Sequence, residues 1–400
     1  MPDTTADRPT PRRVRKPKPA SPDRWLFPLA ALFAAATVPL WLVLREGGLA
    51  YATWHGHELL FGYALAVAAG FLVTRAGPVG TGLLLASWLA ARLAAAIPDG
   101  LLSVLAGLSF PAMVLALAAP PLWRGAKRWE NRIVPLLLTA LLALDALWWL
   151  GALRLDTPLG PELQGRALLA TLDLFALLML IIGGRVLPAA MGGYLERRGI
   201  ARRDHVRRGY ELPLAGLILA AVLLDLAGLG AAAGMFCLAV AAVTLVRVSA
   251  WQLHHARGRA ELWTLALGYL WLIPALTLKG LAQVGVLASL PHALHGLTVG
   301  ALGTLTLVMM GRTAALRVRR PFGAFRDIIV AALLVGVAAV LRLVAAPALA
   351  GRETLLWLAA LAWSVAFLIL LLRLVRVYHF GGQKGGIATK STQGSEGPSA

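Results

Sequence analysis

The sequence predicts an all-α protein that crosses a membrane many times. Hydrophobic residues make up 59% of the 400 residues and charged residues only 14%, against roughly 45–50% and about 25% in soluble domains. The mean hydropathy is +0.74. The apolar residues form long blocks, and a membrane helix needs about 20 mostly apolar residues in a row. A water-soluble enzyme, a fibrous repeat and a disordered regulator are therefore excluded.

About twelve apolar blocks are long enough to be transmembrane helices. Glycine, proline and charged residues separate them, as in Pro98-Asp99-Gly100 and Pro120-Pro121, because these residues interrupt helices or favour water. The boundary between the seventh and eighth blocks rests on Asp225 and on Gly228 to Gly230. In chain order, the expected helices are 25–45, 57–74, 79–97, 100–119, 133–152, 166–188, 211–229, 231–248, 261–280, 292–311, 326–346 and 353–377.

The basic residues indicate which side of the membrane each connection faces. Most of the 38 Lys and Arg residues fall before the first block, after the even-numbered blocks and at the C-terminal end. Because short basic loops stay in the cytoplasm, this alternation predicts that both termini are cytoplasmic. Eleven helices would break the alternation. Membrane orientation therefore explains the net charge of +19, so the lipid bilayer is the expected partner and nucleic acid is not.

The chain divides into one membrane domain and two tails. Residues 1–24 form a basic, proline-rich cytoplasmic tail, residues 25–378 form the twelve-helix domain, and residues 379–400 form a disordered cytoplasmic tail. No small-residue cleavage site follows the first block, so we expect a retained helix and not a removed signal peptide. The lone cysteine, Cys237, excludes an internal disulfide and a metal site made only of cysteines.

Four of the eight histidines are expected on the side opposite the termini, at the starts of the second and tenth helices. They are candidates for metal or haem binding, because imidazole is a common ligand of transition metals and haem iron. His292 and His295 are three residues apart and share a helical face, whereas His55 and His57 are two apart and do not. Glu58 could orient an imidazole as an acceptor. Interfacial polar residues bonded to each other and to water are the alternative interpretation. The other four histidines are expected in solvated cytoplasmic segments: His205, His254, His255 and His379.

The second and tenth helices share a stripe in which every fourth residue is small. Such stripes let helix backbones approach closely in lipid. One hypothesis is that the two helices pack together and bring both histidine pairs to one site. The alternative is that each stripe contacts a different neighbour. The stripes are Gly62, Ala66 and Gly70 in one helix and Gly296, Gly300 and Thr304 in the other.

Several charged residues lie in or near the apolar blocks, where insertion is expensive and usually marks function. Asp173 is the deepest acid and Lys279 the clearest base. They could pair, line a proton path or meet haem propionates, and the sequence does not distinguish these roles. The segment Gly183-Gly184-Arg185-Val186-Leu187-Pro188 is expected to break the sixth helix. The other members of this group are Arg92, Asp145, Asp225 and Arg342.

Four stretches carry a specific resemblance. They are Trp54-His55-Gly56-His57-Glu58-Leu59-Leu60-Phe61-Gly62 with Ala69-Gly70-Phe71-Leu72-Val73-Thr74; Ile182-Gly183-Gly184-Arg185-Val186-Leu187-Pro188; Leu267-Gly268-Tyr269-Leu270-Trp271-Leu272; and Leu294-His295-Gly296-Leu297-Thr298-Val299-Gly300-Ala301-Leu302-Gly303-Thr304. Their order and spacing, over about residues 25–378, resemble the NnrS family. The resemblance implies a multi-pass protein of the bacterial inner membrane that is tied to nitric oxide and nitrosative stress, with nitric oxide and a redox partner as its expected partners.

The resemblance also implies haem, of b type, and copper as cofactors near the periplasmic face. It makes His55, His57 and His295 the first ligand candidates, with His292 next. The chain departs from the family at Ala266, where many relatives carry histidine, which leaves open whether it holds both cofactors or one. The residues carried over from the family's pattern are His55, His57, Glu58, Arg185, His295 and Arg312.

Two other functions stay open on the sequence. A secondary transporter is compatible with twelve helices and a basic loop after the sixth, although Thr74-Arg75-Ala76-Gly77-Pro78 lacks the charge pattern of the major facilitator proteins. A cofactor-free scaffold for other membrane proteins is the third option. The sequence does not show whether the protein is an enzyme. A haem protein would absorb in the Soret region, and the other two would not.

Overall fold

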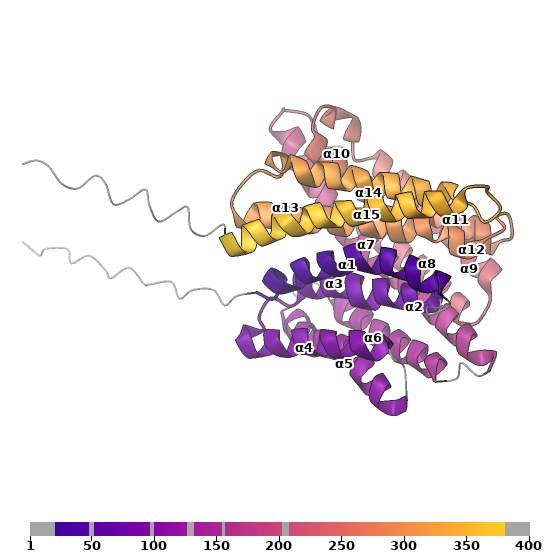
Figure 1. Cartoon of the computed structure of the whole chain (residues 1–400). Helices are drawn as coiled ribbons and strands as arrows, with labels where there is room; N and C mark the ends of the chain where they lie inside the picture. The colour runs from indigo at the N-terminus through magenta and orange to yellow at the C-terminus, as the bar shows by residue number, and fades with distance from the viewer. Residues whose placement is uncertain are drawn as a thin grey trace, which may run out of the picture.

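The computed structural model describes residues 21–47, 52–96, 100–125, 132–153, 157–201 and 208–380. Over these ranges the chain is all-α and contains no β-strand. The long helices pack side by side into one bundle (Figure 1). The fold class expected from composition is therefore confirmed. The expected tails, 1–24 and 379–400, fall almost entirely outside the described residues.

The first half of the bundle contains eight helical segments, of which α2, η1 and α3 follow one another without a break. They are α1 (Asp23–Glu46), α2 (Ala52–His57), the π-helix η1 (Glu58–Ala64), α3 (Leu65–Leu72), α4 (Gly77–Ala96), α5 (Gly100–Arg124), α6 (Ile133–Ala152) and α7 (Leu159–Glu196).

In the second half, two long helical rods are each built from shorter segments that follow one another. One rod consists of α10 and α11, and the other consists of α12, η5 and α13. The helices are α8 (Glu211–Leu226), α9 (Gly230–Ser249), α10 (Ala260–Leu270), α11 (Leu272–Gln283), α12 (Leu290–Ala293), the π-helix η5 (Gly296–Gly303), α13 (Thr304–Arg317), α14 (Arg326–Val344) and α15 (Arg352–Val375). Short helical turns flank them: η3 (Arg208–Tyr210), η4 (Leu253–Ala256), η6 (Phe322–Ala324) and η7 (Arg376–Phe380).

Ten helices in the described part of the chain are long and apolar enough to cross a membrane. The expected spans 57–74 and 211–229 are helical but are not among the ten. The first lies in the run of α2, η1 and α3, which carries the polar side chains of His55, His57 and Glu58 near its start, and the second, α8, has only 16 residues. The protein is thus a multi-pass membrane protein, and the total of twelve spans stays a prediction.

Helices α1 and α15 lie side by side although they are far apart in the sequence (Figure 1). The Trp363 indole N–H donates to the carbonyl of Ala34 at 2.8 Å. Near the ends of the described chain, the Tyr378 hydroxyl donates to the Asp23 carboxylate at 2.9 Å. We call this end of the bundle the tail end. The opposite end, which holds the cavity described below, is called the chamber end. Which side of the membrane the tail end faces stays a prediction.

Helix α7 is the most buried of the ten candidate spans, and it continues unbroken to Glu196. The expected break between Gly183 and Pro188 is therefore wrong. Pro188 has no N–H, so the carbonyl of Gly184 loses its partner within the helix. The Arg247 guanidinium of α9 replaces that partner and donates to the carbonyls of Gly184 and Leu180, each at 3.2 Å. A cation from a neighbouring helix thus allows α7 to pass through a proline.

The small-residue stripes of the second and tenth predicted helices face different neighbours. Gly70 lies against the Phe27 ring of α1. Gly300 lies against the indole of Trp271, which joins α10 to α11. The hypothesis that the two stripes pack on each other is wrong, because the two helices face each other across a cavity instead of along their small residues.

Candidate functional site

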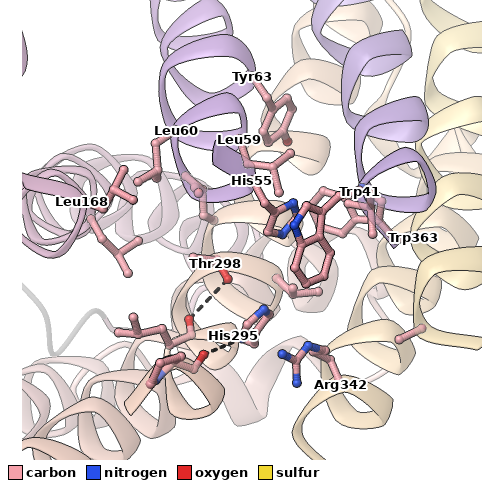
Figure 2. Close-up of a pocket in the computed structure, with 18 of the residues that line it drawn as sticks. Trp41, His55, Leu59, Leu60, Tyr63, Leu168, His295, Thr298, Arg342 and Trp363 are labelled. Carbon is pink, nitrogen blue, oxygen red and sulfur yellow. Dashed lines mark hydrogen bonds between the residues drawn. The ribbon is translucent and has the colours of Figure 1, made fainter. Parts of the chain in front are cut away.

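A cavity of about 390 Å³ lies among the helices in the chamber half of the bundle, and we call it the chamber. Its walls come from α1, α2, η1, α7, α12, η5, α14 and α15. Most of the lining side chains are Leu, Val, Ala or Trp, with a few polar groups among them (Figure 2). Binding sites for small molecules and cofactors have this composition and size. The polar side chains of the lining are Thr53, His55, Tyr63, His295, Thr298 and Arg342.

His55 faces the chamber from α2. Its ring stacks on the indole of Trp41, with the ring centroids 4.4 Å apart and the planes at 24°. This stacking holds the imidazole in one orientation. The Nδ1 atom is buried and has no hydrogen-bond partner among the described residues. An unpaired buried polar atom costs free energy. This nitrogen is therefore available to a group bound in the chamber.

His295 faces the same chamber from the turn between α12 and η5 (Figure 2). Its Nδ1 lies 2.8 Å from the carbonyl oxygen of Pro291. A carbonyl can only accept, so Nδ1–H donates and the neutral ring carries its lone pair on Nε2. This is the usual arrangement of a metal-binding histidine, in which a backbone carbonyl sets the tautomer and the ring orientation.

A π-helix follows each of the two histidine pairs. The π-helix η1 begins directly after His57, and η5 begins directly after His295. Both contribute to the lining, η1 through Leu59, Leu60 and Tyr63 and η5 through Thr298, Val299 and Leu302. π-helical turns are rare and occur frequently at functional sites. They rotate the preceding residues relative to the rest of the helix and so help to set where each histidine points.

Arg342 of α14 is the one cation in the chamber lining. Its Nη1 lies 3.1 Å from Nδ1 of His292, whose Nε2 lies 2.7 Å from the Leu343 carbonyl. His292 therefore donates to Leu343 and accepts from Arg342, and it holds the guanidinium instead of facing the chamber. Among the described residues no carboxylate pairs with Arg342. Glu353, which acts on it electrostatically, forms ion pairs with Arg45 and Arg352.

His57 points away from the chamber into a separate buried cluster. Its Nε2 lies 2.8 Å from Oδ1 of Asp145, and its Nδ1 lies 3.1 Å from Oε1 of Glu58. Glu58 also pairs with Arg92. The His57 ring stacks on Trp148, with 3.9 Å between centroids. Both ring nitrogens are thus engaged by carboxylates. His55 lines the chamber and His57 does not, in keeping with the expectation that residues two apart do not share a helical face.

The two arginines carried over from the family pattern lie toward the tail end. Arg185 pairs with Glu211 at 2.9 Å. It follows the chamber residue Leu172 along α7 by a distance of roughly 20 Å, at 1.5 Å per residue. Arg312 is half-buried in α13 and follows the last chamber residue of η5, Leu302, by roughly 15 Å. Neither side chain lines the chamber.

Trp41 and Tyr63 are site residues that the sequence analysis did not identify. Tyr63 of η1 is almost fully buried. Its hydroxyl forms a hydrogen bond with the hydroxyl of Thr306 on α13. A tyrosine within an apolar block is a detectable signal, because a buried hydroxyl requires a partner. Trp41 carried no comparable signal, because its importance comes only from its contact with His55.

No group of three or more His, Cys, Asp or Glu side chains that could hold a metal ion occurs among the described residues. The chamber lining contains two imidazoles, one from each histidine pair. A family model described as NnrS protein matches residues 20–379. A comparison with curated proteins found no match.

Proposed function

The chain belongs to the NnrS family, and from this premise we propose that it is a haem-binding membrane protein of nitric oxide metabolism or the nitrosative stress response. His55 and His295 would hold the haem in the chamber. The observation that carries the proposal is that two imidazoles, from parts of the chain 240 residues apart, line one apolar cavity. His57 and His292 take supporting positions.

The chamber fits a haem better than it fits a copper ion held by protein alone. Haem iron needs one or two axial ligands and an apolar surround. His295 presents a free Nε2 and His55 a buried nitrogen without a partner. Arg342 would pair with a carboxylate of the haem. A copper ion would need a third ligand, and Met309 and Met310 do not line the chamber. Copper would therefore require an external ligand.

A haem in this position would supply an iron that binds nitric oxide or passes single electrons. The residues of the chain would bind it, orient it and exclude water. Trp41 and Leu168 close the space around the imidazoles, and Tyr63 offers a hydroxyl near the wall. We propose no reaction beyond binding and electron transfer, and a redox partner would deliver the electrons.

We further propose that the membrane is the bacterial inner membrane and that the chamber faces the periplasm. The support is the charge distribution. Arg317 and Arg373 lie at the tail end, near Asp23 and Asp327, and basic segments favour the cytoplasm. The chamber lies at the opposite end.

The experiment is a visible spectrum of the full chain, expressed with a haem supply, extracted in detergent and washed. We expect a Soret band, and a shift of that band when nitric oxide is added to the reduced protein. His55→Ala and His295→Ala should each lower the absorbance per protein several-fold. The matched control is His254→Ala, a histidine outside the chamber, which should leave the band unchanged. A colourless protein that elutes as a folded species would contradict the proposal.

A secondary transporter is the second candidate, because Arg342, which pairs with no carboxylate among the described residues, offers an amphipathic anion a cation in an apolar chamber. Flux measured in vesicles distinguishes it. Uptake of an organic anion by colourless protein, lost in Arg342→Gln, would favour transport over haem binding.

A further inference from the structure

A second cluster of buried charges lies where α7, α8 and α11 meet, away from the chamber histidines. The Lys279 ammonium donates to both oxygens of Asp173 at 2.6 Å and to Oδ2 of Asp225 at 2.9 Å. The amide of Gln283 donates to Oδ1 of Asp225 at 2.5 Å. Lys279 and Asp173 are fully buried and Asp225 almost so. The structure shows that Asp173 and Lys279 pair, and it adds Asp225 as a third member.

The charges of the cluster do not balance. Two carboxylates face one ammonium, and the three N–H donors of that ammonium are all used. The remaining titratable neighbour is the Cys237 thiol of α9, which contributes no positive charge. Arg166 of α7 does not compensate, because it donates to the Leu226 carbonyl and pairs with Glu162. With both carboxyls ionised, the cluster carries one net negative charge in a setting where an uncompensated charge is very costly.

The two carboxyl groups share one ammonium. Both oxygens of Asp173 and Oδ2 of Asp225 accept from the same nitrogen, Nζ of Lys279. One proton bound by the pair of carboxyls would remove the excess negative charge.

The geometry points to a proton-binding site: Asp173 and Asp225 share one exchangeable proton beside the Lys279 ammonium. Gln283 ends α11, bonds Asp225 and is partly exposed, so the proton would enter from this end of α11. The inference does not rest on the proposed haem. It assigns to this part of the bundle a function in holding and releasing a proton within the membrane.

The cluster lies directly behind the wall of the chamber. Asp173 follows Leu172, which lines the chamber. Leu278, next to Lys279, contacts Gly296, the residue after His295. The shared proton is therefore held one residue from the chamber wall along α7. A reaction in the chamber that consumes protons would have a donor there, without a continuous water channel.

The test is infrared spectroscopy of the detergent-solubilised full chain at a series of pH values, in H₂O and in D₂O. A protonated carboxylic acid has a carbonyl stretch that shifts in D₂O and is absent from a carboxylate. We expect the wild-type protein to lose one such acid per chain as the pH rises. Asp173→Asn and Asp225→Asn should each lose this signal at every pH. Glu162→Gln, which removes an exposed carboxyl of the same helix α7, is the matched control and should keep it.

Lys279→Met gives a second readout. Loss of the ammonium makes ionisation of the pair harder, so the signal should persist to higher pH than in the wild type. The inference is overturned if the wild-type protein shows no pH-dependent acid signal sensitive to D₂O, which would make the cluster a purely structural ion pair. It is also overturned if both asparagine variants keep the wild-type signal. The wild-type spectrum decides the matter even if a variant does not fold.

Discussion

Replacing His57 with alanine should damage the fold and not the chamber. In the wild type the ring bonds Asp145 at 2.8 Å and Glu58 at 3.1 Å and stacks on Trp148. Each hydrogen bond to a charged group contributes about 1.5–3 kcal/mol, and breaking a buried ion pair by removing one partner costs about 3–5 kcal/mol. Because Oδ2 of Asp145 already lacks a partner, the substitution would leave a buried carboxylate without any hydrogen bond.

We therefore expect His57→Ala to lower the free energy of unfolding by about 3–5 kcal/mol. Equilibrium unfolding in mixed micelles with increasing sodium dodecyl sulfate measures it. The comparison is His55→Ala, whose ring bonds no described residue through Nδ1 and which should cost less stability while losing the Soret band. The double variant His57→Ala/Asp145→Ala should lose less than the sum of the two single variants, because the partners are coupled.

The reasoning would be refuted if His57→Ala unfolded like the wild type. If His57→Ala kept wild-type stability and also lost the cofactor, His57 would be a ligand, as the family resemblance implies. His57→Gln keeps one donor, so it should recover part of the stability.

Three further predictions test other contacts. Arg247→Met should lower the free energy of unfolding by about 3 kcal/mol or more, because the Gly184 carbonyl opposite the α7 proline loses its donor; the same unfolding assay measures it, and an unchanged midpoint would contradict it. Tyr63→Phe should cost about 1 kcal/mol through loss of its bond to Thr306, with the Soret band retained. Arg342→Gln should weaken haem binding in a haem titration by roughly tenfold or more, since it removes the chamber's one cation; equal affinity would exclude the proposed carboxylate contact.

The positions and order of the ten long apolar helices followed from hydropathy, because the bilayer requires long apolar segments whatever their neighbours are. The failure at α7 shows the limit of that argument. Proline and glycine at residues 183 to 188 indicate a break in an isolated helix, whereas in the structure the helix continues and Arg247 of α9 donates to the carbonyl that Pro188 leaves without a partner. Nothing local to the segment reveals that donor.

The candidate site was predicted in part. The sequence indicated that histidines of both pairs face one side of the membrane, and the structure brings His55 and His295 to one cavity. It could not indicate which member of each pair faces inward. That choice depends on the rotation of each rod, and the π-helices η1 and η5 alter it. The buried partners Asp145 and Asp225 were visible as charges in apolar blocks, but their pairing depends on contacts between distant helices.

The chamber is closed by α1 on one side and by α15 on another, and this has a consequence for biosynthesis. During translation α1 leaves the ribosome long before α15 does. Until α15 is inserted, Trp41 and its neighbours on α1 lack the wall that Trp363 provides, and the cavity is a groove exposed to lipid. A prosthetic group would therefore meet a complete pocket only after the ribosome has finished the chain. Loading should follow synthesis, and a nascent chain stalled before α15 should retain no pigment.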